Sequence, residues 1–527
     1  MTADTLDMTA IETALASHPM VESVHVERGV ATVVPKFDCS EMEAEQLARW
    51  REVYDESFAD GDPCDMFHGW ISSITGKPLP RADMEEWVEA TVTRIRSLRP
   101  RRIVEIGSGT GLLVERLGPD AESYLAIDAS EACHDRLARL IRARPDLAHV
   151  QQMAADAADL PATLRADTVI LNSVVQYFPN AGYLTRVIEQ AAGWIENGAI
   201  FIGDIRDLRL LPHFQAHSRA SRFMTAAPDQ EEELVIDPAF FHRLGKKASR
   251  IRQIRALLKQ GTRRNELNCY RYDVILHVRA EESPPYVQVT PVNFSSVTEI
   301  RKILEAYEFQ SIDCLTVDNI PNARLAGIST AAQGACSEQT IDPEELFALG
   351  ATLGYRVDLA PGPEPERFDA VFYRGDEPPT LPPKPEWMRP DTRLTNDPAL
   401  PLARSLLPDL LRRYLDARWP GHGVVIKLAR GRDSCAGDVA SCDRPAEAES
   451  VEVHLITLWR EALQAPHIGP DDDFFAHGGS SLLAMLLRQR IADAFGVTVP
   501  LSRFAAGATP RAIAGFIQDA ANAKSGQ

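Results

Sequence analysis

A glycine-rich turn followed by two acidic residues forms the most informative chemical pattern in the chain. The segment IVEIGSGTGLLVERL places Gly107, Gly109 and Gly111 between an expected strand and an expected helix. Glycines let a backbone turn sharply and approach a ligand closely. Asp128 ends the next expected strand, where a carboxylate can accept both ribose hydroxyls, and Asp156 follows the third strand, where it can meet an adenine. The pattern predicts a nucleoside-binding site.

Glycine turns of this kind also occur in NAD enzymes and in turns that bind nothing. Here Glu105 lies inside the strand before the turn, and an acidic residue ends the second strand. This order resembles the class I S-adenosylmethionine-dependent methyltransferases. The resemblance implies that the cofactor is S-adenosylmethionine, and that the residues binding it are Glu105, Gly107, Ser108, Gly109, Gly111, Asp128, Asp156 and Asn172.

A second pattern places a serine at the start of an apolar helix near the C-terminus. In DDDFFAHGGSSLLAMLLRQRI, Gly478 and Gly479 form a turn before Ser481. A helix N-terminus favours a nearby phosphate. The segment resembles peptidyl carrier proteins, whose serine holds a 4′-phosphopantetheine arm. That family usually has His or Asp where Ser480 stands, so the resemblance assigns the arm to Ser481.

Two other interpretations of this serine remain open. Ser480 and Ser481 can simply cap a helix. His477 and Ser481 can also be considered as a hydrolase pair, but no GxSxG elbow surrounds the serine and no third partner is evident. His477 is better interpreted as a surface or packing residue.

The elements that must position these residues follow from the apolar pattern. Residues 101–280 alternate short apolar runs, such as DTVILN and GAIFIGD, with amphipathic stretches. This alternation predicts βαβ units and a Rossmann-like α/β fold with a mostly parallel sheet. Residues 286–380 carry further mixed α/β signals. Residues 451–522 have the pattern of a compact helical domain, which we expect to be a four-helix carrier bundle.

Several further motifs are more specific than the glycine turn. FHGWISSITGKPLP, VILNSVVQYFPNAGYL, FIGDIRDL and NELNCYRYDVILH resemble the methyltransferase domains of nonribosomal peptide synthetases, and IPNARL and IDPEELFALGATLGYRVDL fit their C-terminal part. The resemblance covers about residues 42–378.

Side chains at the ends of the fourth and fifth strands face the same sheet edge as the cofactor. We expect Asn172, Gln176 and Tyr177 to orient a substrate amine as the catalytic residues. The substrate side is expected to include Asp204, Arg206 and His68, with weaker candidates at Glu266, Arg271 and Tyr272. The competing interpretation of each is helix capping or structural hydrogen bonding.

Two flanking segments resemble parts of adenylation domains. IETALASHPMVESVHV resembles the segment that follows the eighth core motif of adenylation domains. NDPALPLARSLLPDLLRRYLDARWP resembles the segment that precedes their ninth core motif. In PGHGVVIKLARGRD no Asn-Gly-Lys appears, and Lys427 is no convincing substitute for the catalytic lysine. The expected domains are 1–40 (adenylation remnant), 41–285 (methyltransferase), 286–380 (accessory region), 381–445 (remnant and linker) and 446–527 (carrier).

These resemblances imply methyl transfer from S-adenosylmethionine to an aminoacyl thioester on the chain's own carrier, in nonribosomal peptide or secondary-metabolite biosynthesis. Family members inserted between the eighth and ninth adenylation motifs usually methylate the backbone amine, and NSVVQYFP and GDIR resemble the N-methylating type, so the resemblance implies the backbone amine as the acceptor. An amine near pKa 8 needs only mild base help, whereas a carbon acceptor would need stronger base chemistry. The alternatives are methylation of oxygen or carbon, or a non-catalytic carrier scaffold. The expected partners are a separate adenylating enzyme that loads the carrier, a phosphopantetheinyl transferase and downstream condensation modules.

The composition of the chain narrows the classes of protein to which it can belong. The 527 residues are 45% hydrophobic and 25% charged, which is typical of globular domains. A net charge of −19 argues against nucleic-acid binding. No apolar run approaches the roughly 20 residues of a membrane helix, and MTADTLDMTA lacks a signal-peptide pattern, so we expect a cytoplasmic protein. The eight cysteines are scattered without a CxxC pair, so neither a disulfide nor a metal site is expected.

Overall fold

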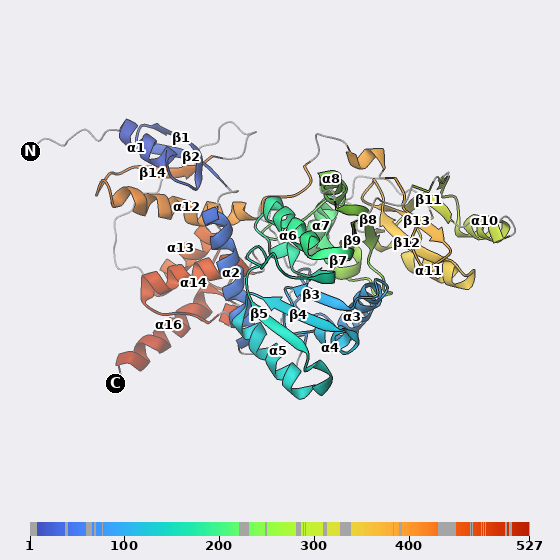
Figure 1. The fold of residues 1–527 in the computed structure, drawn as a ribbon. Coiled ribbons are helices and arrows are strands. Elements are labelled where there is room, and N and C mark those ends of the chain that lie inside the picture. The colour runs from blue at the N-terminus through green and yellow to red at the C-terminus, as the bar shows by residue number, and fades with distance from the viewer. Residues whose placement is uncertain are drawn as a thin grey trace, which may run out of the picture. The chain divides into compact units, whose positions relative to one another are not determined.

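The computed structural model of the chain divides into two units (Figure 1). The central unit comprises Tyr54–Phe223 and Glu233–Asn396, and the outer unit comprises Met1–Val53, Met224–Glu232 and Asp397–Gln527. The structure describes residues 8–36, 40–59, 66–67, 70–75, 77–220, 231–247, 250–280, 286–287, 289, 291–308, 314–326, 339–382, 384–388, 393–429, 450–463, 465, 467–475, 477, 479, 481–500, 503–504 and 508–525.

A seven-stranded sheet forms the centre of the central unit. Its order is β5-β4-β3-β6-β7-β9-β8; strands β3 to β7 are parallel, and β9 runs antiparallel to both of its neighbours. The strand order reverses at β3, which pairs with both β4 and β6, and ligands of such sheets bind outside the strand ends at this point. The strands are β3 (Arg102–Ile106), β4 (Ser123–Asp128), β5 (Val150–Ala154), β6 (Ala166–Asn172), β7 (Ile195–Arg206), β8 (Ile251–Leu258) and β9 (Arg271–Arg279).

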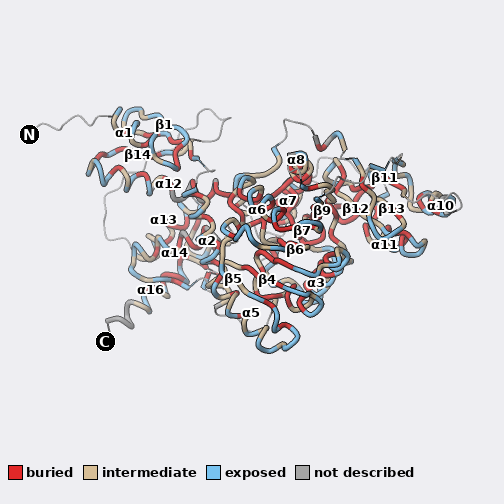
Figure 2. Tube along the Cα trace, viewed as in Figure 1, coloured by how far each residue is buried: buried red, intermediate tan, exposed pale blue. Residues whose placement is uncertain are grey.

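Helices pack beside this sheet, and its central strands β3 and β6 are almost completely buried, whereas the edge strands β5 and β8 are only partly buried (Figure 2). Trp87, Leu113, Phe201 and Ile275 belong to one buried cluster beneath the helices. The helices are α2 (Ser40–Ala59), which crosses the boundary between the two units, and α3 (Arg81–Arg96), α4 (Val114–Leu117), η1 (Gly118–Asp120), α5 (Glu131–Ala143), η2 (Pro145–Leu147), η3 (Val175–Tyr177), α6 (Ala181–Trp194), η4 (Leu208–Leu210), α7 (Leu211–Ala220), α8 (Ala239–Lys247) and α9 (Glu266–Cys269).

A second sheet in the central unit has the order β10-β11-β13-β12. Arg255 of β8 and Asp358 of β12 form a two-pronged ion pair with N–O distances of 2.5–2.9 Å, which joins the two sheets. The elements are β10 (Val292–Asn293), α10 (Val297–Glu308), β11 (Cys314–Pro321), η6 (Ala323–Leu325), α11 (Pro343–Thr352), β12 (Arg356–Pro361), β13 (Arg367–Tyr373) and η7 (Pro385–Met388).

The outer unit contains a small sheet made from two distant parts of the chain. The hairpin β1 (Val21–Glu27) and β2 (Val30–Pro35) turns at Arg28 and Gly29, which both have positive φ, as a tight hairpin turn requires. Strand β14 (Val425–Leu428) pairs in parallel with β2. Buried residues of α1 (Met8–Ala16) and α12 (Ala399–Asp416) belong to the same core. The N-terminal strands therefore complete a sheet with residues that follow the central unit.

Three long helices follow in the outer unit: α13 (Val451–Leu463), α14 (Ser481–Phe495) and α16 (Pro510–Ser525). Trp459 stacks on Phe504 with ring centroids 6.2 Å apart, and Phe474 meets both rings edge-on. The segment VTVPLSRF, in which the resemblance to carrier proteins places their third helix, is described only at residues 497–500 and 503–504. The polar stretch 431–450, in which we expect a linker before the carrier domain, lies outside the described residues except for Ser450.

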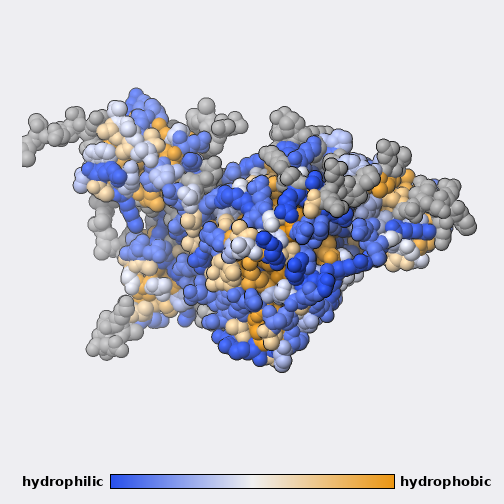
Figure 3. Space-filling view, viewed as in Figure 1, coloured by the Kyte–Doolittle hydropathy of each residue, from blue (hydrophilic) through white to orange (hydrophobic). Residues whose placement is uncertain are grey.

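Hydrophilic side chains cover most of the face shown in Figure 3. Among the residues that the structure describes, no helix combines the length and the apolar character needed to cross a membrane.

Candidate active site

The turn after β3 is held against the end of β4 by backbone hydrogen bonds. The N–H groups of Gly107 and Ser108 donate to Ile127 O at 2.8 and 3.0 Å. The N–H of Gly109 donates to Asp128 Oδ2 at 2.8 Å. The predicted glycine loop and the predicted ribose carboxylate therefore lie in direct contact.

Three glycines of this loop have positive φ, which explains their residue type. The φ values are 76° at Gly107, 53° at Gly109 and 93° at Gly111. A Cβ at Gly107 would lie 2.6 Å from Val174 Cγ2, whereas a Cβ at Gly109 would meet nothing within 4 Å. The loop is thus packed tightly on one side and leaves its backbone open at Gly109.

Asp128 has both carboxylate oxygens fixed by backbone donors. Oδ2 accepts from Gly109 N, and Oδ1 accepts from Ser130 N at 2.9 Å. Burial raises the pKa of Asp128 above its ordinary value, and the N–H groups of Ser130 and Gly109 oppose the rise. Each oxygen keeps a further lone pair, so the carboxylate can still accept hydroxyl donors.

The sequence did not identify Asp55 of α2 as part of this region. Asp55 Oδ1 accepts from Ser130 Oγ at 2.6 Å and from Ala132 N at 3.2 Å, at the start of α5. An acidic residue on a helix is usually a solvated one, so no local signal in the sequence could have revealed this role.

The other predicted cofactor residues have different surroundings. Glu105 is buried and accepts from Tyr124 OH at 2.7 Å, and burial raises its pKa to about 8, so it is a neutral acid at pH 7. Ser108 Oγ is buried and has no hydrogen-bond partner within the described part of the chain. Asp156 is partly exposed just after β5.

These features fit a bound nucleoside. The open backbone at Gly109 gives room for close approach, the oriented carboxylate of Asp128 offers acceptors, and the unpartnered hydroxyl of Ser108 lacks a hydrogen bond that a ligand can supply. The residues present therefore suit S-adenosylmethionine as the sequence predicts it.

Two amides lie at the end of β6. Asn172 Nδ2 donates to Ser173 Oγ at 3.4 Å, and Gln176 Nε2 donates to Ser173 O at 3.0 Å. Both side chains are buried, with 8% and 2% of their surfaces exposed. Asn172 Oδ1 and Gln176 Oε1 have no hydrogen-bond partner among the described residues. Two carbonyl oxygens at the end of β6 are thus buried without a protein donor from the described part of the chain, and Asn172 Oδ1 packs over Gly203 of β7.

Tyr177 packs edge-on against Tyr54 of α2, with ring centroids 5.2 Å apart. Burial and the nearby Glu233 raise the pKa of Tyr177 to about 12. Burial likewise raises the pKa of Tyr54 well above its ordinary value. Both phenols are therefore neutral at physiological pH, and Tyr177 is a hydrogen-bonding group rather than a phenolate base. The sequence analysis did not identify Tyr54 as part of this site.

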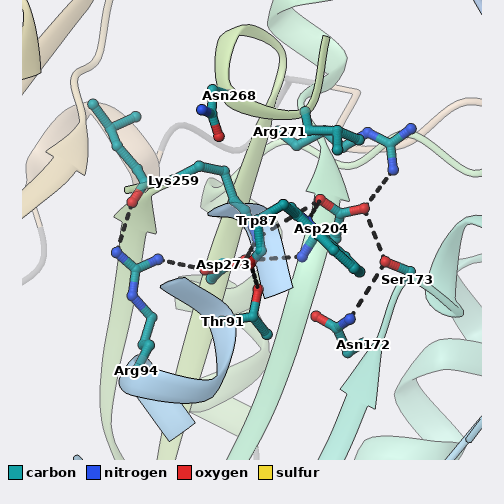
Figure 4. A network of polar contacts seen from close by, with 12 residues as sticks. Trp87, Thr91, Arg94, Asn172, Ser173, Asp204, Lys259, Asn268, Arg271 and Asp273 are labelled. Atoms are coloured by element: carbon teal, nitrogen blue, oxygen red, sulfur yellow. Dashed lines mark hydrogen bonds and ion pairs between the residues drawn. The ribbon is translucent and has the colours of Figure 1, made fainter. Parts of the chain in front are cut away.

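A buried polar network surrounds Asp204 at the end of β7 (Figure 4). Its carboxylate accepts from Trp87 Nε1 at 3.1 Å, Ser173 Oγ at 2.9 Å and Arg271 at 2.5 Å. Burial by itself would raise the pKa of Asp204, but Arg271 and Lys259 hold it below its ordinary value. Asp204 is thus an ionised and well-paired carboxylate.

The network extends to Asp273 of β9. Asp273 accepts from Lys259 Nζ at 2.9 Å, from Arg94 and from the backbone N–H of Asp204 at 2.9 Å. Lys259 Nζ lies 3.7 Å from Asp204 Oδ1. Since buried charges are costly unless paired, this pairing fixes the end of β7 in one arrangement.

The remaining substrate-side candidates hold surrounding segments in place. Arg206 pairs with Glu233 at 2.7 Å and lies 4.7 Å from the centre of the Phe214 ring. Tyr272 OH donates to the backbone oxygen of Ile236 at 2.9 Å.

Glu266 fixes the loop that precedes α3. It accepts from Ser72 Oγ at 2.6 Å and from Ser73 N at 3.0 Å. His68, predicted on the substrate side, lies outside the described residues.

The predicted attachment serine begins a helix. Ser481 is the first residue of α14. Gly479 N donates to Phe474 O at 2.9 Å, and a Cβ at Gly479 would lie 2.2 Å from Phe474 Cδ1, so this turn requires glycine. His477 Nδ1 lies 2.9 Å from Asp473 O, which ties the ring to its own turn.

Two protein families match separate parts of the chain. Residues 104–201 match a family described as methyltransferase domain, and residues 454–517 match one described as phosphopantetheine attachment site. With the strand order above, these matches confirm the expected α/β methyltransferase fold with a mostly parallel sheet, followed by a helical carrier segment.

Curated relatives match along nearly the whole chain. Chondramide synthase cmdD of Chondromyces crocatus is 32% identical over 570 residues, covering 91% of this chain and 14% of that protein. The probable non-canonical nonribosomal peptide synthetase CymA of Salinispora arenicola is 31% identical over 507 residues, covering 90% and 6%. The chain thus spans a small part of these relatives' length.

Among solved structures, the N-methyltransferase NodS of Bradyrhizobium japonicum is similar at 13% identity and a TM-score of 0.31, covering 43% of this chain and 97% of NodS. A similarity of this size does not bear on the acceptor atom.

Proposed function

Because the chain is related to nonribosomal peptide synthetases, with a methyltransferase domain followed by a phosphopantetheine carrier domain, we propose that it methylates the amine of a carrier-bound aminoacyl group. The aminoacyl group is held as a thioester on the 4′-phosphopantetheine arm of Ser481. The observation that carries the proposal is the presence in one chain of an open glycine loop beside Asp128 and a serine at the start of α14.

The residues around β3 and β4 bind the methyl donor. Asp128 accepts the ribose hydroxyls, Gly109 gives the backbone room for close approach, and Ser108 Oγ hydrogen-bonds the donor. When bound, S-adenosylmethionine supplies an electrophilic methyl group. Such a donor needs mainly orientation of the nucleophile, so the role of the protein is to place the acceptor.

Two unpaired amide oxygens support an amine as the acceptor. Asn172 Oδ1 and Gln176 Oε1 are both acceptors without a partner in the described residues. A neutral primary amine offers two N–H donors and keeps its lone pair for the methyl group. Neither oxygen is basic enough to remove a proton from carbon, which disfavours a carbon acceptor.

We also propose that an adenylating activity outside this chain loads the carrier. The segment around β14 carries no Asn-Gly-Lys, and Lys427 lies exposed on this edge strand. Tethering then raises the local substrate concentration to about the millimolar range.

Intact-protein mass spectrometry tests the proposal. A phosphopantetheinyl transferase moves the aminoacyl-pantetheine arm from an aminoacyl-coenzyme A onto the full chain and releases adenosine bisphosphate. S-adenosylmethionine is then added, and fragmentation locates any methyl group. We expect one methyl group on the arm, at nitrogen. Ser481→Ala should lose the arm and the methyl group, whereas the matched control Ser480→Ala should keep both.

In this experiment, Asp128→Ala distinguishes the contribution of the methyltransferase domain from that of the carrier domain. We expect this variant to accept the arm normally, to gain no methyl group and to show no binding of S-adenosylmethionine by calorimetry. Methylation at oxygen or carbon would overturn the choice of acceptor. A wild-type chain that takes the arm but binds no methyl donor would favour the carrier-scaffold alternative.

A further inference from the structure

Ser173 connects the polar network to the two amides at the end of β6. It follows β6 directly and has a backbone φ of 54°, a value that residues other than glycine rarely adopt. Its N–H donates to Gly203 O at 3.1 Å on the neighbouring strand. A strained residue of this kind persists only where the surroundings fix it, and such residues gather at functional sites.

The hydroxyl of Ser173 has a defined direction. Asp204 is an ionised carboxylate and therefore only accepts hydrogen bonds. The hydroxyl proton of Ser173 must then point to Asp204 Oδ2, 2.9 Å away. The lone pairs of Ser173 Oγ remain for a donor, and Asn172 Nδ2 lies 3.4 Å from it.

The backbone carbonyl of Ser173 orients the second amide. It can only accept, and Gln176 Nε2 donates to it at 3.0 Å. Both amides thus turn their nitrogen toward Ser173 and leave their oxygen unpaired. The orientation of each amide follows from this hydrogen-bonding pattern, in which neither amide can be flipped without losing its bond to Ser173.

We propose that Ser173 is a positioning residue that makes the site select an amine over a hydroxyl acceptor. This inference rests on the proposed function. By directing Asn172 Oδ1 and Gln176 Oε1 away from itself, Ser173 creates two acceptors for two N–H donors. A hydroxyl group has a single O–H, so it leaves one buried oxygen unpaired, which is costly.

Asp204 makes this arrangement rigid. Its backbone φ is 66°, and its N–H is fixed by Asp273 Oδ1 at 2.9 Å. Trp87 and Arg271 hold the carboxylate on its other sides. With Asp204 ionised and immobile, the hydroxyl of Ser173 has no alternative direction.

Ser173→Gly provides the sharpest test. Glycine tolerates a positive φ and keeps the carbonyl that holds Gln176, so only the hydroxymethyl side chain is lost. The probes are a non-hydrolysable aminoacyl-pantetheine amide and its α-hydroxyacyl counterpart, each titrated by calorimetry into the full chain with S-adenosylmethionine at pH about 9, where an amine of ordinary pKa is neutral.

We expect the wild-type chain to bind the amine probe roughly tenfold more tightly than the hydroxyl probe. In Ser173→Gly this ratio should fall to between about one and three, with the affinity for S-adenosylmethionine unchanged. The melting temperature should fall moderately, because the buried Asp204 carboxylate loses one donor. Ser173→Ala should lower the ratio equally and lower the melting temperature further, because alanine at a positive φ is strained.

An unchanged ratio in Ser173→Gly, or an equal loss of affinity for both probes, would overturn the positioning role. The wild-type chain can methylate an amine on the carrier while the ratio of the two affinities is the same in wild type and Ser173→Gly. In that case the positioning role of Ser173 fails and the proposed function stands. If the wild-type chain methylates no amine, the proposed function itself fails.

Discussion

Glu105 shows how a residue type that suggests ligand binding can be held neutral by the fold. It lies inside β3, buried, with Tyr124 as its hydrogen-bond donor. Burial raises its pKa from an ordinary 4.5 to about 8. A contact between Glu105 and the methyl donor stays a prediction from the glycine motif.

Because the pKa of Glu105 is raised, we expect the free energy of unfolding to depend on pH. Below about pH 4.5 the carboxyl is protonated in both the folded and the unfolded chain. Between pH 4.5 and 8 only the unfolded chain ionises, so the free energy of unfolding falls as pH rises. Glu105→Gln does not titrate, and we expect its stability relative to wild type to grow by on the order of 2–4 kcal/mol from pH 5 to 8.

Urea unfolding of both proteins at several pH values measures this difference. The same experiment with Tyr124→Phe, which removes the hydrogen bond to Glu105, shows how far that bond opposes the shift. A stability difference between Glu105→Gln and wild type that stays constant with pH would contradict a neutral Glu105.

Local order in the sequence revealed one half of the candidate site. The glycine loop and Asp128 are recognisable because each follows a strand in a fixed order along the chain. Tyr54, Asp55 and Glu233 come from other segments, and only tertiary packing brings them to the strand ends. Ser173 lies in the motif VILNSVVQYFPNAGYL, but its residue type does not reveal its positive φ.

At the scale of elements, the pairing of β6 with β7 requires a glycine at position 203, because a side chain there would have no room. Asn172 and Gly203 are direct partners on these strands. A Cβ at Gly203 would lie 2.1 Å from Asn172 Oδ1 and 2.6 Å from Phe201 Cε1. The Asn172 amide thus occupies space that only glycine leaves.

We expect Gly203→Ala to destabilise the central unit by roughly 1–3 kcal/mol, because the added methyl group has no room. Gly193→Ala is the matched control: Gly193 is an exposed residue of α6, and a Cβ there meets nothing within 4 Å. This control should be neutral or more stable by up to about 1 kcal/mol. Denaturant unfolding compares the two, and equal effects would contradict the packing argument.

The alternation of strands and helices predicted the mostly parallel sheet correctly, since buried parallel strands give short apolar runs. The antiparallel placement of β9 could not be predicted, because its apolar run VIL resembles the apolar runs of the parallel strands. Nor could the sequence show which strand the N-terminal hairpin joins, because pairing over such a separation leaves no local pattern.

At the scale of the whole molecule, the two units predict two unfolding transitions. Ligand binding to one folded unit stabilises that unit alone, by about 2.7 kcal/mol at a ligand concentration of 100 times Kd. We expect S-adenosylmethionine to raise the melting temperature of one transition and leave the other unchanged. Differential scanning calorimetry of the full chain measures both.

Asp128→Ala should abolish this shift, whereas Ser481→Ala should preserve it. A single transition that moves as a whole would show that the two units unfold together.

The small sheet of the outer unit has a consequence for synthesis. Strands β2 and β14 pair although about 400 residues separate them. At roughly 5–20 residues per second, a ribosome needs on the order of 20–80 s to travel that distance. During this time one edge of the nascent hairpin has no partner, so we infer that this edge is where a holding chaperone would be needed while the ribosome completes the intervening enzyme.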